Sequence, residues 1–360
     1  MRTGKARAAL AGLLMAALPH LPGAANAAPP APLPPPPSPA ENPTSPAKAE
    51  LGKKLFFDRR LSGDGTMACA SCHDPESGYA DGLAISLAYP TTKNWRNSPS
   101  IVNAAYRTAL FRDGRAASLE EQALFPMMSP FEMNRSLDYV EEVLKTVPEY
   151  VEAFRNLFGG EITRWRIAMA IAAFERTIVS RDTPLDRHLR GEKDALTPRQ
   201  RAGYELFVGK AGCAECHGGE NLADGRFHNL GVPEDPKVME DPRVLATARF
   251  VGKVSGFPEY RNMAGDPGRY LVTKSREDWK AFATPPLREV ASTAPYMHNG
   301  ALATLADVID FYDRGGGDDP KKSPLLKPLG LSKNEKETLK DFLAGALSGP
   351  VPVIRPPSLP

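Results

Sequence analysis

The sequence has little net charge and no long hydrophobic segment. Each of these two properties argues against one class of protein. Its 45 Lys and Arg residues nearly balance its 43 Asp and Glu residues, whereas a chain that binds nucleic acid usually carries a basic excess or a basic stripe. The apolar run at residues 8–18 is too short to cross a bilayer as a helix. We therefore expect no nucleic-acid partner, and we do not expect an integral membrane protein.

Cysteine is also scarce, and all four cysteines fall into two copies of one pattern. Residues 69–73 have the sequence Cys-Ala-Ser-Cys-His, and residues 213–217 have the sequence Cys-Ala-Glu-Cys-His. In this pattern the thiols add to the vinyl groups of a haem, and the histidine is placed to bind its iron. A single copy would also suit a thiol redox pair or half of a zinc site. Two copies favour two covalent c-type haems, held by Cys69, Cys72, His73, Cys213, Cys216 and His217.

Residues 1–27 have the features of a signal peptide. Arg2, Lys5 and Arg7 precede the apolar run, and the small residues at positions 25–27 follow it as a cleavage-type sequence. A membrane anchor at the N-terminus is the alternative, but the cleavage-type sequence argues against it. Because c-type haem is attached outside the bacterial cytoplasm, we expect a periplasmic protein.

The rest of the chain divides into regions of different composition. Residues 28–46 are rich in Pro, Ala and Ser, which predicts an extended tether without a packed core. We expect an N-terminal haem domain at residues 47–190, a C-terminal haem domain at residues 191–350 and a short tail at residues 351–360.

Helical spacing of apolar residues dominates both expected domains. It predicts long amphipathic helices over residues 137–158 and 162–179. Further helices are expected near residues 197–209, 305–312 and 333–347, whereas residues 218–288 are rich in Gly, Pro and Asp and are expected to be largely loops. Strand signals are few, so the predicted fold class is mainly α.

The loop after the first Cys-x-x-Cys-His motif lacks the common strong sixth ligands of a haem iron. Neither histidine nor methionine occurs between His73 and Asn97. Tyr79, Tyr89 and Lys93 remain as weaker candidates.

Eight further segments form an ordered pattern around the two motifs. They are residues 55–58 (Leu-Phe-Phe-Asp), 97–100 (Asn-Ser-Pro-Ser), 113–116 (Asp-Gly-Arg-Ala), 120–123 (Glu-Glu-Gln-Ala), 129–133 (Ser-Pro-Phe-Glu-Met), 174–177 (Phe-Glu-Arg-Thr), 227–231 (Phe-His-Asn-Leu-Gly) and 294–300 (Ala-Pro-Tyr-Met-His-Asn-Gly). With these segments the chain resembles the bacterial di-haem cytochrome c peroxidase and MauG family. The resemblance implies two cytochrome-c-like haem domains with long haem-wrapping loops, and haems that face a shared interface.

The resemblance also assigns the ligands of the second haem. Tyr312 stands where the better-known peroxidases have a methionine ligand, and residues 308–314 resemble the MauG branch, in which tyrosine binds the iron. A phenolate is an anionic donor that favours the higher oxidation states of iron. The alternative is that Tyr312 is a core residue of its helix and Met297 binds instead.

For the first haem, the resemblance implies an open position where hydrogen peroxide binds. Cleavage of the O–O bond needs a group that moves a proton from one oxygen to the other. By family position this group is Glu132, and Gln122 and Pro126 line the same pocket. His228 and His298 are expected at haem edges rather than on iron.

The family further implies one calcium ion between the haems. Its expected protein ligands are the side chain of Asn97 and the main-chain carbonyls of Thr293 and Pro295.

Two positions depart from the family pattern. Arg112 stands where the family usually has a tryptophan before Asp-Gly-Arg, and Ala211 stands where MauG has a surface tryptophan near the second motif. The tryptophans of this chain are Trp95, Trp165 and Trp279, of which Trp95 lies closest in sequence to the expected calcium ligand.

Together these observations predict a periplasmic di-haem peroxidase of the MauG-like type. It is expected to reduce hydrogen peroxide at the open haem, store oxidising equivalents on the His/Tyr-ligated haem and oxidise a redox partner protein or another donor. One alternative is an ordinary cytochrome c peroxidase that takes electrons from a small redox protein. The other is a di-haem electron carrier without catalysis.

Overall fold

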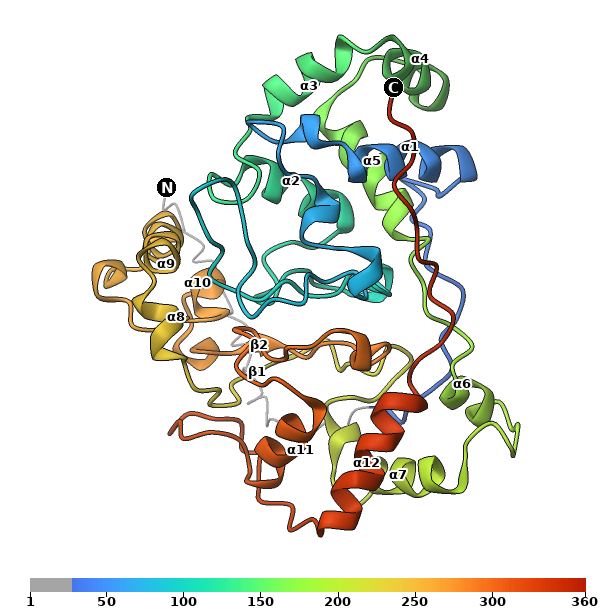
Figure 1. Cartoon of the computed structure of the whole chain (residues 1–360), viewed down its shortest axis with the longest axis vertical. Coiled ribbons are helices and arrows are strands. Elements are labelled where there is room, and N and C mark those ends of the chain that lie inside the picture. The colour runs from blue at the N-terminus through green and yellow to red at the C-terminus, as the bar shows by residue number, and fades with distance from the viewer. Residues whose placement is uncertain (1–27) are drawn as a thin grey trace, which may run out of the picture.

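The computed structural model describes residues 28–360, so the expected signal peptide lies outside the described residues. The protein is mainly helical, which confirms the predicted fold class (Figure 1). The helices before residue 191 are α1 (Pro46–Phe57), α2 (Leu119–Met128), α3 (Leu137–Lys145), α4 (Pro148–Phe158), α5 (Arg164–Glu175) and α6 (Pro184–Leu189). Those after it are α7 (Pro198–Val208), α8 (Pro236–Glu240), α9 (Pro242–Val254), α10 (Tyr270–Thr273), α11 (Leu305–Asp313) and α12 (Lys333–Gly345). The strands β1 (Phe227–His228) and β2 (Phe282–Ala283) pair antiparallel.

Prolines set several helix starts. The single helix expected over residues 137–158 is wrong, because Pro148 begins a new helix, α4, and Val147 before it is extended. A proline lacks the N–H that a helix interior needs and disfavours helical geometry in the residue before it. Residues 218–288 contain more helix than expected: α9 starts where the Asp241 side chain accepts a hydrogen bond from the Arg243 N–H and Pro242 takes the first helical position.

Two helix pairs form the two main cores. In the first, α1 crosses α5 so closely that a Cβ on Gly52 would lie 1.8 Å from the carbonyl oxygen of Ala170, and Phe56 packs against Phe174. In the second, Phe207 of α7 packs against Phe342 of α12, with ring centroids 5.3 Å apart. Figure 1 shows these pairs at opposite ends of the molecule. Since each pair contains the helix that leads into a Cys-x-x-Cys-His motif, the expected division into two haem domains stays our proposal for the domain boundaries.

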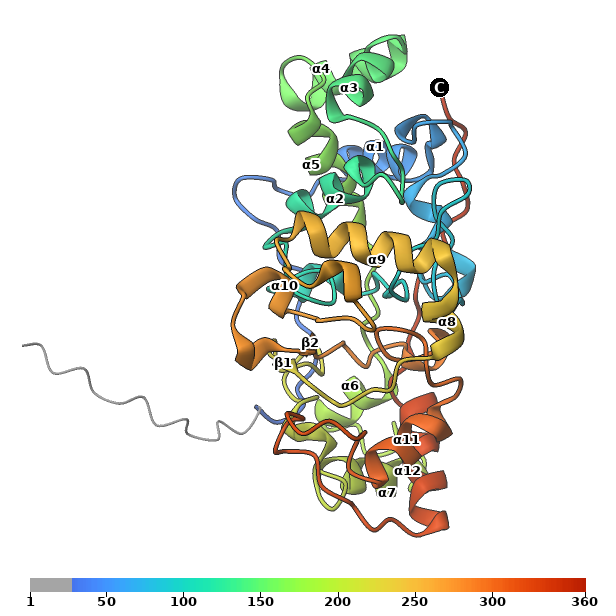
Figure 2. The ribbon, with the colours of Figure 1, turned by 90° about the vertical axis from the view of Figure 1, so that its left-hand side faces the viewer.

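A third, smaller core lies between them. Val244 and Ala248 of α9 and Leu271 of α10 pack with Ile85 and Trp95 from the loop after the first motif. Figure 2 shows α9 and α10 on one side of the molecule, between the two helix pairs. Trp95 is therefore a packing residue of this core, and it is buried.

The two ends of the described chain cross both main cores. Residues 28–46 are extended up to the start of α1 at Pro46 and form no core of their own, but they pack against the rest of the chain. Leu33 is buried, the Tyr106 hydroxyl donates to the carbonyl of Pro34 at 2.7 Å, and the Asn42 amide donates to Glu120 at 2.6 Å. At the other end, the tail runs back along the first core (Figure 1), where Tyr79 donates to the carbonyl of Pro352 at 2.5 Å.

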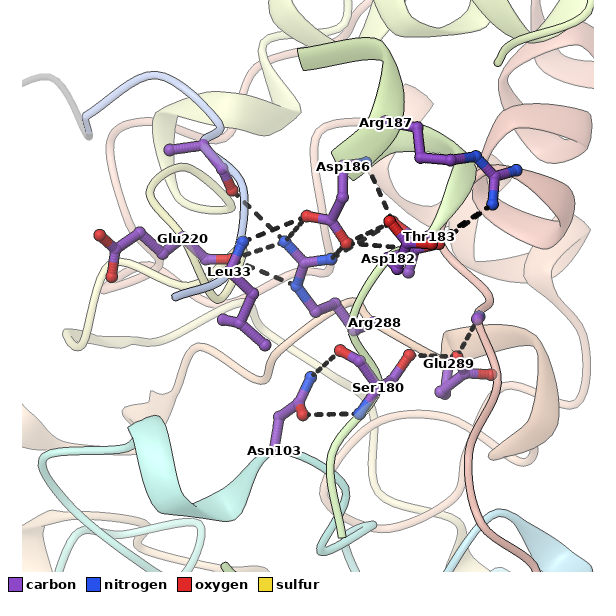
Figure 3. A network of polar contacts seen from close by, with 12 residues as sticks. Leu33, Asn103, Ser180, Asp182, Thr183, Asp186, Arg187, Glu220, Arg288 and Glu289 are labelled. Carbon is purple, nitrogen blue, oxygen red and sulfur yellow. Dashed lines mark hydrogen bonds and ion pairs between the residues drawn. The ribbon is translucent and has the colours of Figure 1, made fainter. Parts of the chain in front are cut away.

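A buried ion pair anchors the N-terminal segment to the second half of the chain (Figure 3). The two terminal nitrogens of Arg288 donate to the two carboxylate oxygens of Asp186 at 2.7 and 2.8 Å, and the Leu33 N–H donates to the same carboxylate at 3.2 Å. Burial would raise the pKa of Asp186, but the hydrogen bonds from Arg288 and Thr183 outweigh it and hold the pKa below its usual value. The Asp186 carboxylate therefore stays charged, and its buried charge is compensated by Arg288.

We predict that Arg288→Met destabilises the protein strongly. The variant leaves the Asp186 carboxylate buried without a partner, and breaking such a pair costs about 3–5 kcal/mol in the free energy of unfolding. Urea unfolding monitored by circular dichroism measures the loss. The matched control is Arg187→Met, whose partly exposed side chain pairs with Asp182 at 3.8 Å and should cost less than about 1 kcal/mol. Equal losses in both variants would contradict the assignment.

Candidate active site

The first Cys-x-x-Cys-His motif borders a cavity of about 460 Å³. Cys69 begins a 3₁₀ turn, Cys69–Ser71, and Cys72 is the residue that ends it. His73 follows, and all three motif residues line the cavity. The expected catalytic residues Gln122 and Glu132 line the same cavity, as does Pro126. Gln122 and Pro126 lie four residues apart on α2 and so share one helix face.

The second motif borders a cavity of about 270 Å³. It repeats the local structure of the first, because Cys213–Glu215 also forms a 3₁₀ turn before His217. Tyr312, near the end of α11, lines this cavity, and so does Met297. The fold thus brings both candidate ligands of the second haem to the cavity, and the choice of Tyr312 stays a prediction.

Both motif histidines have the ring nitrogen Nδ1 held by a main-chain carbonyl. Nδ1 of His73 lies 3.2 Å from the carbonyl oxygen of Tyr79, and Nδ1 of His217 lies 3.1 Å from that of Leu222. A carbonyl only accepts, so Nδ1 carries the proton, and Nε2 is the nitrogen that a metal would take. Burial lowers the pKa of both rings, which favours the neutral imidazole that binds iron. Paired thiols, a fixed imidazole and an adjoining cavity fit a c-type haem at each motif.

Glu132 is held at the edge of the first cavity. The Asn94 side chain donates to its Oε1 at 3.0 Å, and the following residue is fixed by a hydrogen bond from the Met133 N–H to the carbonyl of Pro126 at 3.1 Å. Glu132 is half-buried. Its partner Asn94 was missed by the sequence analysis, because it lies in the irregular loop 38 residues earlier.

The weaker candidates for a sixth ligand have other partners. The Tyr79 hydroxyl donates to Pro352, and the Lys93 ammonium pairs with Asp241 at 2.9 Å. In the described part of the chain, neither these two residues nor Tyr89 lines the first cavity. Three methionines that were not considered as ligands of the first haem do line the cavity, namely Met67, Met128 and Met133.

Glu175 is a further carboxyl group at the first cavity, which Glu132 and Asp113 also line. The sequence analysis places it in the segment 174–177 but assigns it no role. It ends α5 and is buried, and its Oε2 has no hydrogen-bond partner among residues 28–360. Burial raises the pKa of Glu175 to about 8, although the charge of Arg176 opposes this. At neutral pH the group is therefore mainly the neutral acid.

His228 and His298 both line the second cavity. Nε2 of His228 lies 2.8 Å from Oδ2 of Asp224, and this hydrogen bond is the main cause that raises the pKa of His228 to about 9. His298 stacks on Phe282 at a centroid distance of 3.8 Å, and its Nε2 lacks a partner within the described chain. The ligand atoms of Cys216, Asp224 and His228 lie close together, but Cys216 belongs to the haem motif, so we assign no separate metal to them.

The two cavities share one wall. Residues 97–100, Arg107 and Arg112 line both of them. A buried ion triad supports this wall: Arg96 donates to Asp113 at 2.6 Å and to the two oxygens of Asp266 at 2.5 and 2.9 Å. Because Arg96 precedes Asn97 and Asp113 follows Arg112, the triad fixes the backbone on both sides of the wall.

The residues expected to bind calcium meet at this wall, but the oxygens of one of them, Asn97, already accept hydrogen bonds from a side chain. Asn97, Thr293 and Pro295 line the second cavity together with Arg112. Nη2 of Arg112 donates to Oδ1 of Asn97, and Nε of Arg112 donates to the main-chain oxygen of Asn97 at 3.3 Å. The side-chain oxygen assigned to calcium is therefore already occupied.

Comparisons with known proteins agree with this site. The family model described as di-haem cytochrome c peroxidase matches residues 46–194. The chain is 47% identical to the cytochrome-c peroxidase IdrP1 of Pseudomonas sp. (strain SCT) over 93% of this chain and 90% of the relative. It is 39% identical to the methylamine utilization protein MauG of Methylorubrum extorquens over 88% and 82%. A crystal structure of a MauG-like protein associated with microbial copper homeostasis superposes with a TM-score of 0.75 at 32% identity, covering 88% of this chain and 93% of that one.

None of the helices in residues 28–360 is long and apolar enough to cross a membrane.

We predict that Glu175→Gln makes stability less dependent on pH between pH 5 and pH 8. In the unfolded chain Glu175 ionises near its ordinary pKa of 4.5, whereas in the folded protein it keeps its proton to about pH 8. The unfolded state therefore releases the proton first, and wild-type stability falls as pH rises, by at most about 1.4 kcal/mol per pH unit. Urea midpoints across this range measure the difference.

The control for this experiment is Glu152→Gln, which changes an exposed glutamate of α4. Its stability should stay parallel to that of the wild type at every pH. If the Glu175→Gln variant also stays parallel, Glu175 is not the buried acid described here.

Proposed function

The chain belongs to the di-haem cytochrome c peroxidase and MauG family, and from this premise we propose that it is a periplasmic, MauG-like peroxidase. It is a haem-dependent oxidoreductase with two c-type haems. We propose that hydrogen peroxide is reduced at the first cavity and that electrons from a redox partner enter through the second. The observation that carries this proposal is the shared wall, which brings the two haem cavities together over residues 97–100.

Reduction of hydrogen peroxide to two water molecules consumes two electrons and two protons. The haems supply the one-electron redox chemistry, and the protein must position the peroxide and move its protons. We assign the proton transfer to Glu132, which takes a proton from one peroxide oxygen and returns it to the leaving oxygen. The hydrogen bond from Asn94 holds the carboxylate in place, and the Gln122 amide, which lines the same cavity, orients the peroxide.

At the second cavity we assign to Tyr312 the role of an iron ligand. Burial raises the pKa of the free phenol, so a phenolate at this place would need a cation beside it, which ferric iron would supply if a haem is bound there. An anionic oxygen ligand would favour the higher oxidation states of that iron, and Tyr312 would in this way help the protein to keep an oxidising equivalent until a donor is oxidised.

The electron donor is best explained as a redox protein. Ala211 takes the place that the MauG branch gives to a surface tryptophan, and it is small and buried, so this point offers no aromatic side chain to a protein substrate. Relatives named cytochrome-c peroxidase reach 47% identity, which supports the ordinary donor-oxidising activity as the second candidate. Both candidates consume hydrogen peroxide. They differ in the ligand of the second haem.

A steady-state assay tests the common activity. The oxidised holoenzyme, mixed with a reduced small c-type cytochrome, should oxidise it only when hydrogen peroxide is added. A holoenzyme with both haems attached that neither oxidises the cytochrome nor consumes peroxide would support the non-catalytic electron carrier instead.

We predict that Glu132→Gln slows the reaction of the oxidised enzyme with hydrogen peroxide by about 10²- to 10⁴-fold, the usual contribution of a general acid–base group. The amide keeps the shape of the side chain but cannot take a proton. Stopped-flow absorption measures the rate, and the haem content should stay at two per chain. Glu152→Gln serves as the control for a simple loss of charge. A Glu132→Gln rate equal to that of the wild type would remove Glu132 from the mechanism.

We predict that Tyr312→Phe changes the ligation of one haem and leaves the other unaltered. Loss of the anionic ligand should raise the reduction potential of that haem, which optical and EPR spectra recorded during a redox titration will report. Tyr204→Phe, a tyrosine that packs beside Phe342 in the same core, is the control. If the spectra stay unchanged in Tyr312→Phe but change in Met297→Leu, Met297 is the ligand.

A further inference from the structure

Arg112 occupies the oxygen that the family resemblance assigns to calcium, and this arginine is itself a departure from the family pattern. We propose that the guanidinium of Arg112 is a built-in cation that takes the place of the calcium ion between the two haem sites. The protein would then hold its shared wall without a bound metal ion. This inference does not depend on which donor delivers the electrons.

The geometry of Asn97 supports the replacement. Nε and Nη2 lie on one edge of the guanidinium and donate to the two oxygens of this single residue. The planar fork of arginine suits two neighbouring acceptors in this way. The Asn97 amide cannot turn its oxygen elsewhere, because its nitrogen donates to the carbonyl of Leu83 at 2.7 Å.

The backbones of both partners are fixed as well. The Asn97 N–H donates to the carbonyl of His298 at 2.8 Å, and the carbonyl of Arg112 accepts from the Ala283 N–H of β2 at 2.8 Å. Arg112 and Asn97 are therefore placed by main-chain contacts that do not involve a metal. The guanidinium of Arg112 therefore binds two oxygens of Asn97 whose positions the main-chain hydrogen bonds have already set.

The guanidinium of Arg112 is not taken up by a carboxylate near the wall. Arg107 and Arg112 line the wall, and neither forms an ion pair with a carboxylate of residues 28–360. The carboxylates that flank the wall, Asp113 and Asp266, are already paired with Arg96. Glu234, which also lines the second cavity, accepts a hydrogen bond from the Asp266 N–H at 2.9 Å. The polar contacts of the Arg112 side chain in this region are therefore those with the two oxygens of Asn97.

Arg112 remains a cation under ordinary conditions. An arginine side chain carries its charge at neutral pH. Unlike a bound ion, it cannot be removed by a chelator, because it is part of the chain.

The test measures metal content and stability of the holoenzyme rather than its turnover. Wild-type holoenzyme is dialysed against EGTA or against millimolar calcium chloride, its calcium content is determined by plasma mass spectrometry, and its thermal unfolding midpoint is recorded. We expect no stoichiometric calcium and the same midpoint in both buffers. Stoichiometric calcium in the wild type, together with a lower midpoint in EGTA, would overturn the proposal.

Two variants sharpen the test. Arg112→Trp frees both oxygens of Asn97 and removes one positive charge, so it should gain saturable calcium binding and a midpoint that rises with calcium. Arg107→Leu also removes a cation from the wall but leaves the contacts of Asn97 in place, and it should gain neither. If both variants gain calcium binding equally, charge alone excludes the ion and the specific role of Arg112 is wrong. Peroxide turnover, measured in parallel, reports separately on the proposed function.

Discussion

The buried triad of Arg96, Asp113 and Asp266 is the interaction on which the functional part of the structure depends. All three side chains are almost completely buried, and in such surroundings the loss of one partner leaves an uncompensated charge that is costly to keep. Asp266 comes from the segment before α10, so the triad also ties the irregular loop of the first half to the third core. The wall between the cavities, from Asn97 to Arg112, is the part of the chain that this triad holds.

The composition of that wall determines how the two haems can influence each other. A tryptophan between them would offer an aromatic side chain that can itself be oxidised, whereas a guanidinium acts through its charge. A positive charge beside two haems favours the reduced state of both. The proposed phenolate of Tyr312 lowers the potential of only one. In this arrangement the tyrosine ligand makes the reduction potentials of the two haems different, and the positive charge of the wall shifts both potentials in the same direction.

Features that depend on residues close together in the sequence could be predicted, whereas features that depend on distant residues could not. The haem motifs and the helices α5, α7, α11 and α12 depend on neighbouring residues, and these helices were predicted close to their observed bounds. The start of α4 at Pro148 and the whole of α9 were missed despite local proline signals, and the shorter helices α2, α6, α8 and α10 were missed as well. The packing of residues 28–46 depends on partners such as Glu120 and Tyr106, far along the chain, so composition indicated only an extended segment. The places of Glu132 and Tyr312 came from the resemblance. Asn94 needed the folded structure because it lies in an irregular loop, and Glu175 needed it because the sequence of segment 174–177 does not show that this carboxyl group is buried at a cavity.

The same long-range contacts explain why a metal-free wall is physically reasonable. A bound ion between two domains supplies attraction that the chain would otherwise lack. Here the N-terminal segment is joined to the second half through the pair of Arg288 and Asp186, and the C-terminal tail returns to the first core at Tyr79. The relative position of the two cavities is thus fixed by both chain ends and by the Arg96 triad. With the domains already held together, the cation at the wall has only to satisfy the two oxygens of Asn97, and one arginine side chain is sufficient for that.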